Sequence, residues 1–337
     1  MTARSAGALR QVRAAVQAEL DDLADGTRVL VALSGGPDSL ALAAAAAHGP
    51  WRAGAVVVDH GLQEGSADVA ARASSQAIEL GLAPVVVREV RVSPGDPSGP
   101  EGAARRVRRA ALLEAADELS AGAVLLAHTL DDQAETVLLG LARGSGARSL
   151  AGMPRRDGRW RRPLLGLRRD VTAAACRELG LEPWTDPHNA DPAFTRVRVR
   201  HAALPVLVAA LGPDVPLALA RTAAQLRADD EALHGWAVQV WQAADGEGGL
   251  DVTALADVPD AVRARVLRLA CLAAGVPGGA LTSSHLATLD RYVTAWRGQG
   301  PTALPGRVEA RRTCGRLCLT GPNQQTGTTI PTSADQA

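Results

Sequence analysis

The most informative absence in this 337-residue chain is lysine, because all 36 basic residues are arginine. Enzymes that work through a covalent lysine intermediate are therefore excluded. A Walker-type phosphate loop is excluded as well, since that motif needs a lysine after its last glycine. Aromatic residues are scarce, with one Phe and one Tyr beside six Trp. The apolar 47% is dominated by Ala, Val and Leu, which reflects coding bias more than function.

Cysteine is also rare, and four cysteines in a chain of this size do not make a disulfide framework. Cys176 and Cys271 lie in helical contexts and are expected in the core. Cys314 and Cys318 have C-x3-C spacing, but the chain supplies no second Cys or His pair to complete a zinc site. The role of this last pair stays open.

The N-terminal segment, residues 1–20, has three arginines and no continuous apolar run. It predicts neither a signal peptide nor a membrane anchor, so we expect a cytoplasmic protein without membrane contact. The formal net charge is zero, which argues against a general nucleic-acid binder. Arginines nevertheless cluster in 105–109, 155–169 and 196–200. Such clusters fit a defined anionic ligand, or else a solvated surface with acids nearby.

The first two thirds of the chain alternate between apolar strands and helices. Val29–Leu33 reads as a buried strand, and the Ala/Leu-rich residues 40–47 read as a helix. We expect further strands at 53–58, 85–92 and 123–127, with helices at 66–80 and 103–119 and a loop at 93–102. This order predicts an α/β fold, a parallel twisted sheet with helices on both faces. Ligands of such sheets bind beyond the carboxyl ends of the strands.

The strongest domain boundary is Gly212–Pro216, where a glycine and two prolines occur together. We therefore expect a catalytic domain over 1–212 and a smaller, mostly helical domain over 217–320. Helices are predicted at 217–244, 259–274 and 282–296, followed by a hairpin over 308–320. The Thr-, Gln- and Pro-rich tail, 321–337, is expected to be disordered.

Two stretches carry the chemistry. Between the first strand and helix lie Ser34-Gly35-Gly36-Pro37-Asp38-Ser39, where adjacent glycines let backbone N–H groups converge on a phosphate. The other reading is an ordinary turn, with Asp38 or Ser39 as the helix N-cap.

The second stretch, 128–136, places one histidine and three acids at helical spacing: His128, Asp131, Asp132 and Glu135. Three acids on one face repel one another unless a cation lies there. Mg²⁺ on a nucleotide, or a substrate ammonium, would satisfy them. An acidic first turn stabilised by the helix dipole is the alternative.

The loop Ser34–Ser39 resembles the pyrophosphate-binding loop of the N-type ATP pyrophosphatases, or PP-loop superfamily, whose fold is Rossmann-like. The ordered set of motifs resembles the tRNA(Ile)-lysidine synthetase family over roughly residues 25–210. After the loop, the motifs are Asp59-His60-Gly61-Leu62, Glu101 to Arg105 with Arg108, His128 to Thr136, Leu141 to Gly146, Arg162 to Leu165, Asp186 to Asn189, Thr195-Arg196 and Arg200-His201.

The resemblance implies a reaction in two steps. ATP adenylates the 2-carbonyl oxygen of the wobble cytidine in a CAU-anticodon isoleucine tRNA, releasing pyrophosphate. The ε-amine of free L-lysine then displaces AMP to give lysidine, which switches codon reading from AUG to AUA. The implied ATP-binding residues are Ser34, Gly35, Gly36, Pro37, Asp38, Ser39, Asp59, His60 and His128.

The resemblance also assigns roles to charged residues. Asp38 and Glu135 would surround Mg²⁺ on the triphosphate, and Asp132 would hold the lysine ammonium. Which acid accepts the proton of this amine stays open. Arg105 and Arg108 would contact the cytidine or the phosphate. Three further arginines are candidates for tRNA-backbone or lysine-carboxylate contacts: Arg143, Arg196 and Arg200.

The chain departs from the family pattern in places. Arg109 stands where the family usually has Tyr, and Val197 follows Arg196 where an amide is usual. After residue 215 the resemblance is faint, so we expect a short form lacking the most C-terminal domain. Two other functions stay open: another PP-loop tRNA-modifying enzyme, such as a cytidine thiolase, or an inactive RNA-binding homologue. The oligomeric state is also open, with a homodimer as one option.

Overall fold

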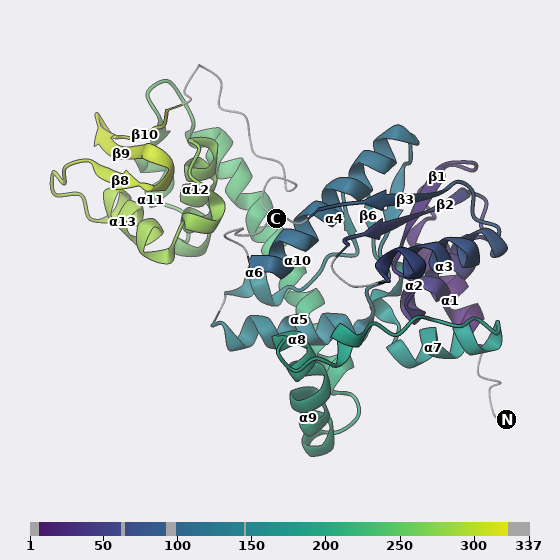
Figure 1. Cartoon of the computed structure of the whole chain (residues 1–337). Coiled ribbons are helices and arrows are strands. Elements are labelled where there is room, and N and C mark those ends of the chain that lie inside the picture. The colour runs from purple at the N-terminus through teal and green to yellow at the C-terminus, as the bar shows by residue number, and fades with distance from the viewer. Residues whose placement is uncertain (1–6, 62–64, 92–98, 145, 323–337) are drawn as a thin grey trace. The chain divides into compact units, whose positions relative to one another are not determined.

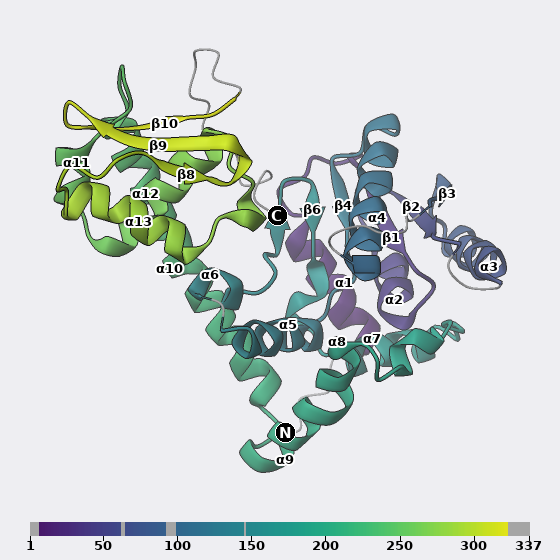
Figure 2. The same ribbon diagram turned by 60° about the vertical axis from the view of Figure 1, so that its left-hand side comes forward.

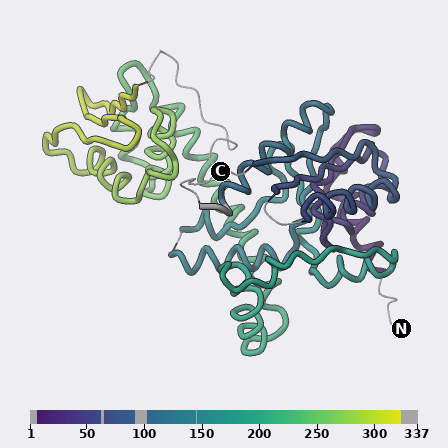
Figure 3. Tube along the Cα trace, viewed as in Figure 1, coloured from purple at the N-terminus to yellow at the C-terminus, as the bar shows by residue number. Residues whose placement is uncertain are grey.

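The computed structural model describes residues 7–61, 65–91, 99–144 and 146–322. Contacts divide the chain into two compact units, Met1–Gln225 and Leu226–Ala337, and each is described here by itself. The chain trace can be followed from purple to yellow in Figure 1 and Figure 3. The tail that we expected to be disordered covers 321–337, and its residues 323–337 lie outside the described residues.

A six-stranded sheet forms the centre of the first unit, with strand order β3-β2-β1-β4-β6-β5. Its first five strands in this order pair in parallel, and the short β5 runs antiparallel to β6. The strands are β1 (Arg28–Leu33), β2 (Arg52–Asp59), β3 (Val85–Glu89), β4 (Ala123–Leu125), β5 (Arg156–Asp157) and β6 (Trp160–Arg161). The predicted parallel sheet is thus confirmed.

Helices cover both faces of this sheet, and β1 therefore buries side chains on both sides. Val29, Val31 and Leu33 pack into a core with α1 (Ala8–Glu19), α2 (Pro37–Ala46), α3 (Ser66–Glu79) and α7 (Arg169–Glu178). Leu30 turns the other way, toward Leu112 and Ala116 of α4 (Gly99–Glu118). This alternation is the two-residue period of a strand, and it places the end of β1 between two packed layers.

The remaining helices of the first unit follow β4 and β6. They are α5 (Leu130–Ala142), α6 (Ala147–Leu150), the 3-10 turns Pro163–Gly166 and Pro187–Ala190, α8 (Thr195–Arg198), a π-helical turn Val199–Ala203 and α9 (Leu204–Leu211). Residues 212–214, where we placed the domain boundary, form the turn into α10 (Val215–Ala244). That long helix contains the division between the two units.

The second unit combines helices with a sheet. Its helices are α11 (Val252–Ala256), α12 (Asp260–Ala273) and α13 (Ser283–Thr294), with 3-10 turns at Gly278–Ala280 and Pro305–Arg307. An antiparallel sheet of order β7-β10-β9-β8 lies over them in Figure 2. Its strands are β7 (Leu250–Asp251), β8 (Thr302–Leu304), β9 (Val308–Thr313) and β10 (Arg316–Thr320). The β9–β10 hairpin confirms the prediction, whereas β7 and β8 are too short to show a strand period.

No single helix among the described residues is both long and apolar enough to cross a bilayer. The pair Thr195–Leu211 and Val215–Ala244 reaches the required length and hydropathy only when combined, across a bend of 99°.

The core of the second unit can be tested at Leu267 of α12, because this side chain is fully buried. Leu267→Ala should lower the free energy of unfolding of this unit by about 2–5 kcal/mol, because it leaves a cavity. Leu211→Ala is the matched control, since Leu211 is 73% exposed, and it should change stability by less than about 0.5 kcal/mol. Urea denaturation followed by tryptophan fluorescence measures both, and equal effects would contradict the burial assigned here.

Candidate active site

The loop after β1 is built to present backbone to a ligand. Gly35 has φ +79°, a conformation that favours glycine, and Gly36 is the extended N-cap of α2. The Ser39 hydroxyl accepts from the Ser34 N–H at 3.2 Å and donates to the Gly36 carbonyl at 2.9 Å. Asp38 and Ser39 lie in the first turn of α2, where the helix dipole favours an anion. The loop therefore offers a phosphate site at the carboxyl end of the sheet.

The acidic stretch begins α5 with a capping box. The Thr129 hydroxyl accepts from the Asp132 N–H, while the Thr129 N–H donates to Asp132 Oδ2 at 2.8 Å. This arrangement fixes the Asp132 side chain at the helix start. Burial alone would raise the pKa of Asp132, but the positive charge of Arg169 and these hydrogen bonds hold it below its usual value. Asp132 is therefore a carboxylate at neutral pH.

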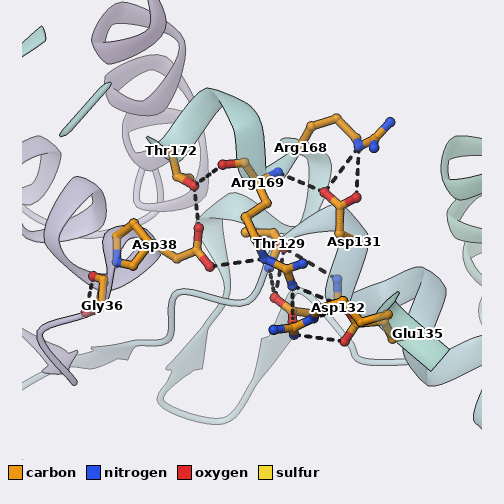
Figure 4. A network of polar contacts seen from close by, with 12 residues as sticks. Gly36, Asp38, Thr129, Asp131, Asp132, Glu135, Arg168, Arg169 and Thr172 are labelled. Carbon is orange, nitrogen blue, oxygen red and sulfur yellow. Dashed lines mark hydrogen bonds and ion pairs between the residues drawn. The ribbon is translucent and has the colours of Figure 1, made fainter. Parts of the chain in front are cut away.

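The cations beside the acids come from the protein itself. Arg169, at the start of α7, donates to Asp132 Oδ1 at 2.9 Å and Glu135 Oε1 at 3.3 Å. Arg200, in the π-helical turn, donates to Glu135 Oε1 at 2.7 Å and to Asp132 Oδ1 at 3.3 Å. Arg196 Nε lies 3.6 Å from the fully buried Glu135 carboxylate. Figure 4 shows Arg169 among the acids.

Asp131 is separate from this group. Both of its oxygens accept from Arg168 Nε, at 3.0 and 3.1 Å, and the Arg169 N–H donates to Oδ2 at 2.8 Å. Four arginines thus compensate the negative charge of these acids. In this structure the acids need neither Mg²⁺ nor a substrate ammonium to offset their mutual repulsion.

Asp38 joins the phosphate loop to the same network. Its carboxylate accepts a hydrogen bond from the Thr172 hydroxyl, and its Oδ2 lies 3.7 Å from Arg169 Nε. Burial raises the pKa of Asp38 to about 6, although Thr172 and Arg169 oppose the shift. A desolvated carboxylate of this kind is stabilised by an approaching cation.

Two histidines line the other side of the loop. Arg108 Nε of α4 donates to His60 Nε2 at 3.0 Å, which leaves the His60 proton on Nδ1. Burial and the charge of Arg108 lower the pKa of His60. Burial lowers the pKa of His128 to about 4, so its ring is neutral at pH 7. Nδ1 of both rings is buried without a hydrogen-bond partner among the described residues, which is uncommon for a buried polar atom.

A cavity of about 470 Å³ unites these groups at the carboxyl ends of β1, β2 and β4. Its volume is in the range of small-molecule sites. The predicted site residues that line it are Ser34, Gly36, Pro37, Asp38, Ser39, Asp59, His60, Arg108, His128, Asp132 and Arg200. Glu135 and Arg196 lie behind Asp132 and reach the network only through ion pairs.

Three further predicted residues are not among those that line the cavity: Gly35, Arg105 and Arg143. Arg105 is exposed on α4, three residues before Arg108, and Arg143 is exposed at the end of α5. Arg169 was not singled out from the sequence. This residue lay within the arginine cluster 155–169, which fits either a defined anionic ligand or a solvated surface. Its neighbours in that run, Arg155 and Arg156, instead pair with buried Glu19. These arginines differ in their tertiary partners, because Arg169 contacts acids of α5 and the other two contact Glu19 of α1.

Arg109, which stands where the family usually has Tyr, has partners within the fold. Its guanidinium lies 4.9 Å from the Trp160 ring centre and 3.8 Å from the Asp157 carboxylate. It therefore stacks within the fold.

Comparisons with known proteins agree with this geometry. A family model described as the PP-loop domain matches residues 8–207, and one described as the TilS substrate binding domain matches 250–318. A tRNA(Ile)-lysidine synthase of Thermobifida fusca is 55% identical over 91% of this chain and 96% of its own length. The chain belongs to the tRNA(Ile)-lysidine synthase family. A second member, from Leifsonia xyli subsp. xyli, is 57% identical over 84% of this chain and 87% of its own length.

The fold has a solved counterpart outside the tRNA(Ile)-lysidine synthases. The U34-tRNA thiolase NcsA from Methanococcus maripaludis matches with a TM-score of 0.54 at 19% identity, over 65% of this chain and 79% of that one. This likeness concerns the fold alone. The family match at 250–318 also extends the resemblance beyond residue 215, where the motifs had become faint.

Asp38→Asn should raise the stability of the ligand-free protein at pH 8. The folded-state pKa of about 6 exceeds the reference 3.8, so the folded state binds more protons between these values and stability falls as pH rises through them. The neutral amide avoids this loss, so the variant should gain up to about 3 kcal/mol at pH 8 and much less at pH 4.

Urea denaturation at both pH values measures the difference between variant and parent. Asp170→Asn, an exposed carboxylate in the first turn of α7, is the control. It should change stability by less than about 0.5 kcal/mol at either pH. An Asp38→Asn variant less stable than the parent at pH 8 would contradict the burial cost assigned to Asp38.

Proposed function

We propose that this protein ligates L-lysine to the 2-position of the wobble cytidine of CAU-anticodon tRNA(Ile), with ATP converted to AMP and pyrophosphate. The observation that carries the proposal is the near full-length match to tRNA(Ile)-lysidine synthases. The cavity supports it, because a phosphate loop and an acidic helix start face one another there. Because the proposed substrate is a tRNA, we expect the reaction to take place in the cytoplasm.

The triphosphate of ATP is bound by the loop Ser34–Ser39, with the two neutral histidines beside it. Backbone N–H groups and the start of α2 supply positive potential there. Neutral His60 and His128 line the cavity beside this loop, so their rings contact the bound nucleotide. Asp59, which accepts from the Gly61 N–H at 2.9 Å, orients the turn after β2.

Magnesium fits one of the two carboxylates predicted for it. Asp38 lines the cavity, and a cation would offset the burial of its charge. Glu135 fits poorly, because it is fully buried and both of its oxygens accept from Arg200. No cluster of three metal-ligating side chains occurs among the described residues. Asp38 would thus hold magnesium together with the triphosphate, and the ion would supply neutralisation of phosphate charge.

Asp132 holds the lysine ammonium. Its low pKa makes it a strong electrostatic partner but a weak base. The free amine has a pKa of about 10.4, so Asp132 binds the protonated amine and does not remove its proton at neutral pH. The amine must lose this proton before it attacks the cytidine, so the proton goes to an acceptor other than Asp132.

The arginines divide by position. Arg108 lines the cavity and contacts the cytidine or the α-phosphate, with Arg105 beside it on the same face of α4. Arg200 lines the cavity from the far side and suits the lysine carboxylate, while Arg196 supports Glu135. We assign Arg143 to the tRNA backbone, which its exposure would allow.

A thiolase reaction is disfavoured by the cysteines. Cys176, which donates to the Pro37 carbonyl, is buried, and burial raises its pKa to about 11. A thiol in that state is a poor nucleophile and a poor cluster ligand. Cys271, Cys314 and Cys318 all belong to the second unit.

The test combines purified protein, ATP, magnesium and labelled lysine with tRNA(Ile) transcripts. Label should enter the tRNA with a CAU anticodon, and mass spectrometry of the wobble nucleoside should show lysidine. The control is the same transcript with the wobble cytidine changed to uridine, which should take up no label. A thiolated cytidine, equal labelling of the control, or no product at all would each overturn the proposal.

A further inference from the structure

The acids and arginines between the phosphate loop and α5 balance in charge. Three carboxylates, Asp38, Asp132 and Glu135, face three guanidinium groups, from Arg169, Arg196 and Arg200. The nearby Asp131–Arg168 pair is neutral as well. Without a ligand, the cluster therefore offers little attraction to an added cation.

Asp132 lines the cavity, as Asp38 does, and both of its oxygens already accept hydrogen bonds. Oδ2 accepts from the Thr129 N–H and hydroxyl, each at 2.8 Å, and Oδ1 accepts from Arg169 at 2.9 Å. Arg200 is its more distant partner, at 3.3 Å, and makes its shorter contact with Glu135. An amine that approaches Asp132 must therefore displace one of these two arginines, and Arg169 is the one that also lies beside the phosphate loop.

Arg169 also extends to the other half of the site. Its Nε lies 3.7 Å from Asp38, next to the phosphate loop, and it lines the same cavity. A triphosphate on that loop adds several negative charges within reach of this side chain. The long arginine side chain can then turn from Asp132 to a phosphate oxygen, a strong charge-assisted contact.

We propose that Arg169 couples the two small substrates: ATP withdraws it from Asp132, and this exposes the carboxylate that receives the lysine ammonium. The inference rests on the proposed function, and it makes Arg169 a positioning residue. Nucleotide and amine then bind cooperatively, each increasing the affinity for the other by the same factor. Typical coupling of this kind is about 5–150-fold.

The first measurement is calorimetric titration of lysine into the full-length protein, with and without magnesium and the non-cleavable analogue α,β-methylene-ATP. Lysine should bind at least about 10-fold more tightly with the analogue. Nε-acetyl-lysine, which lacks the side-chain ε-ammonium, should show no such gain. Equal lysine affinity in the two conditions would overturn the coupling.

Arg169→Gln removes the charge but keeps a long polar side chain. In this variant Asp132 is already exposed, so lysine should bind without nucleotide, and the analogue should improve its affinity by less than about 3-fold. Arg169→Lys, which restores a cation, should recover part of the coupling. Arg168→Gln is the matched control, because Arg168 is adjacent in sequence and pairs with Asp131 outside the cavity. It should retain the full gain.

Two further outcomes would also count against the inference. Lysine binding abolished in folded Arg169→Gln would make Arg169 part of the lysine site itself. Coupling lost equally in Arg168→Gln would indicate a general structural effect. The lysidine assay keeps the two proposals apart: if the parent protein forms lysidine but binds lysine independently of nucleotide, only the coupling fails.

Discussion

The active site depends on ion pairs between carboxylates at the start of α5 and arginines from later segments. Glu135 has no exposed surface, yet it accepts hydrogen bonds from Arg169 and Arg200. A buried carboxylate without such partners would be strongly destabilising. The pairs therefore tie α5 to α7 and to the π-helical turn before α9. They also fix the wall of the cavity that faces the phosphate loop.

Arginine suits this position better than lysine. Its planar guanidinium donates to several acceptors at once and stays charged when buried. Arg169 uses that geometry to contact Asp38, Asp132 and Glu135 together. The π-helical turn has a similar consequence, because it turns Arg200 toward the acids. Such turns are frequent at functional sites.

The parallel sheet sets where the ligand groups meet. Strands β1, β2 and β4 end at one edge, so Ser34, Asp59 and His128 converge although they are far apart in the sequence. This much was predictable, because each strand is a continuous apolar run followed at once by polar residues. The hairpin of the second unit was predictable for a different reason, the turn at Gly315, where the backbone has φ +75°. The two-residue strand β7 was not, because it forms only by pairing with β10.

Local sequence determined the phosphate loop, the acidic first turn of α5 and the alternation that makes an α/β sheet. Glycine conformations and helix caps depend on neighbours within a few residues. The partners of the acids depend on tertiary structure, because Arg169 and Glu135 are 34 positions apart and meet only when the fold brings the first residue of α7 within reach of α5. In sequence, Arg155, Arg156 and Arg169 belong to one basic run. Packing directs the first two to Glu19 and the last to the active site.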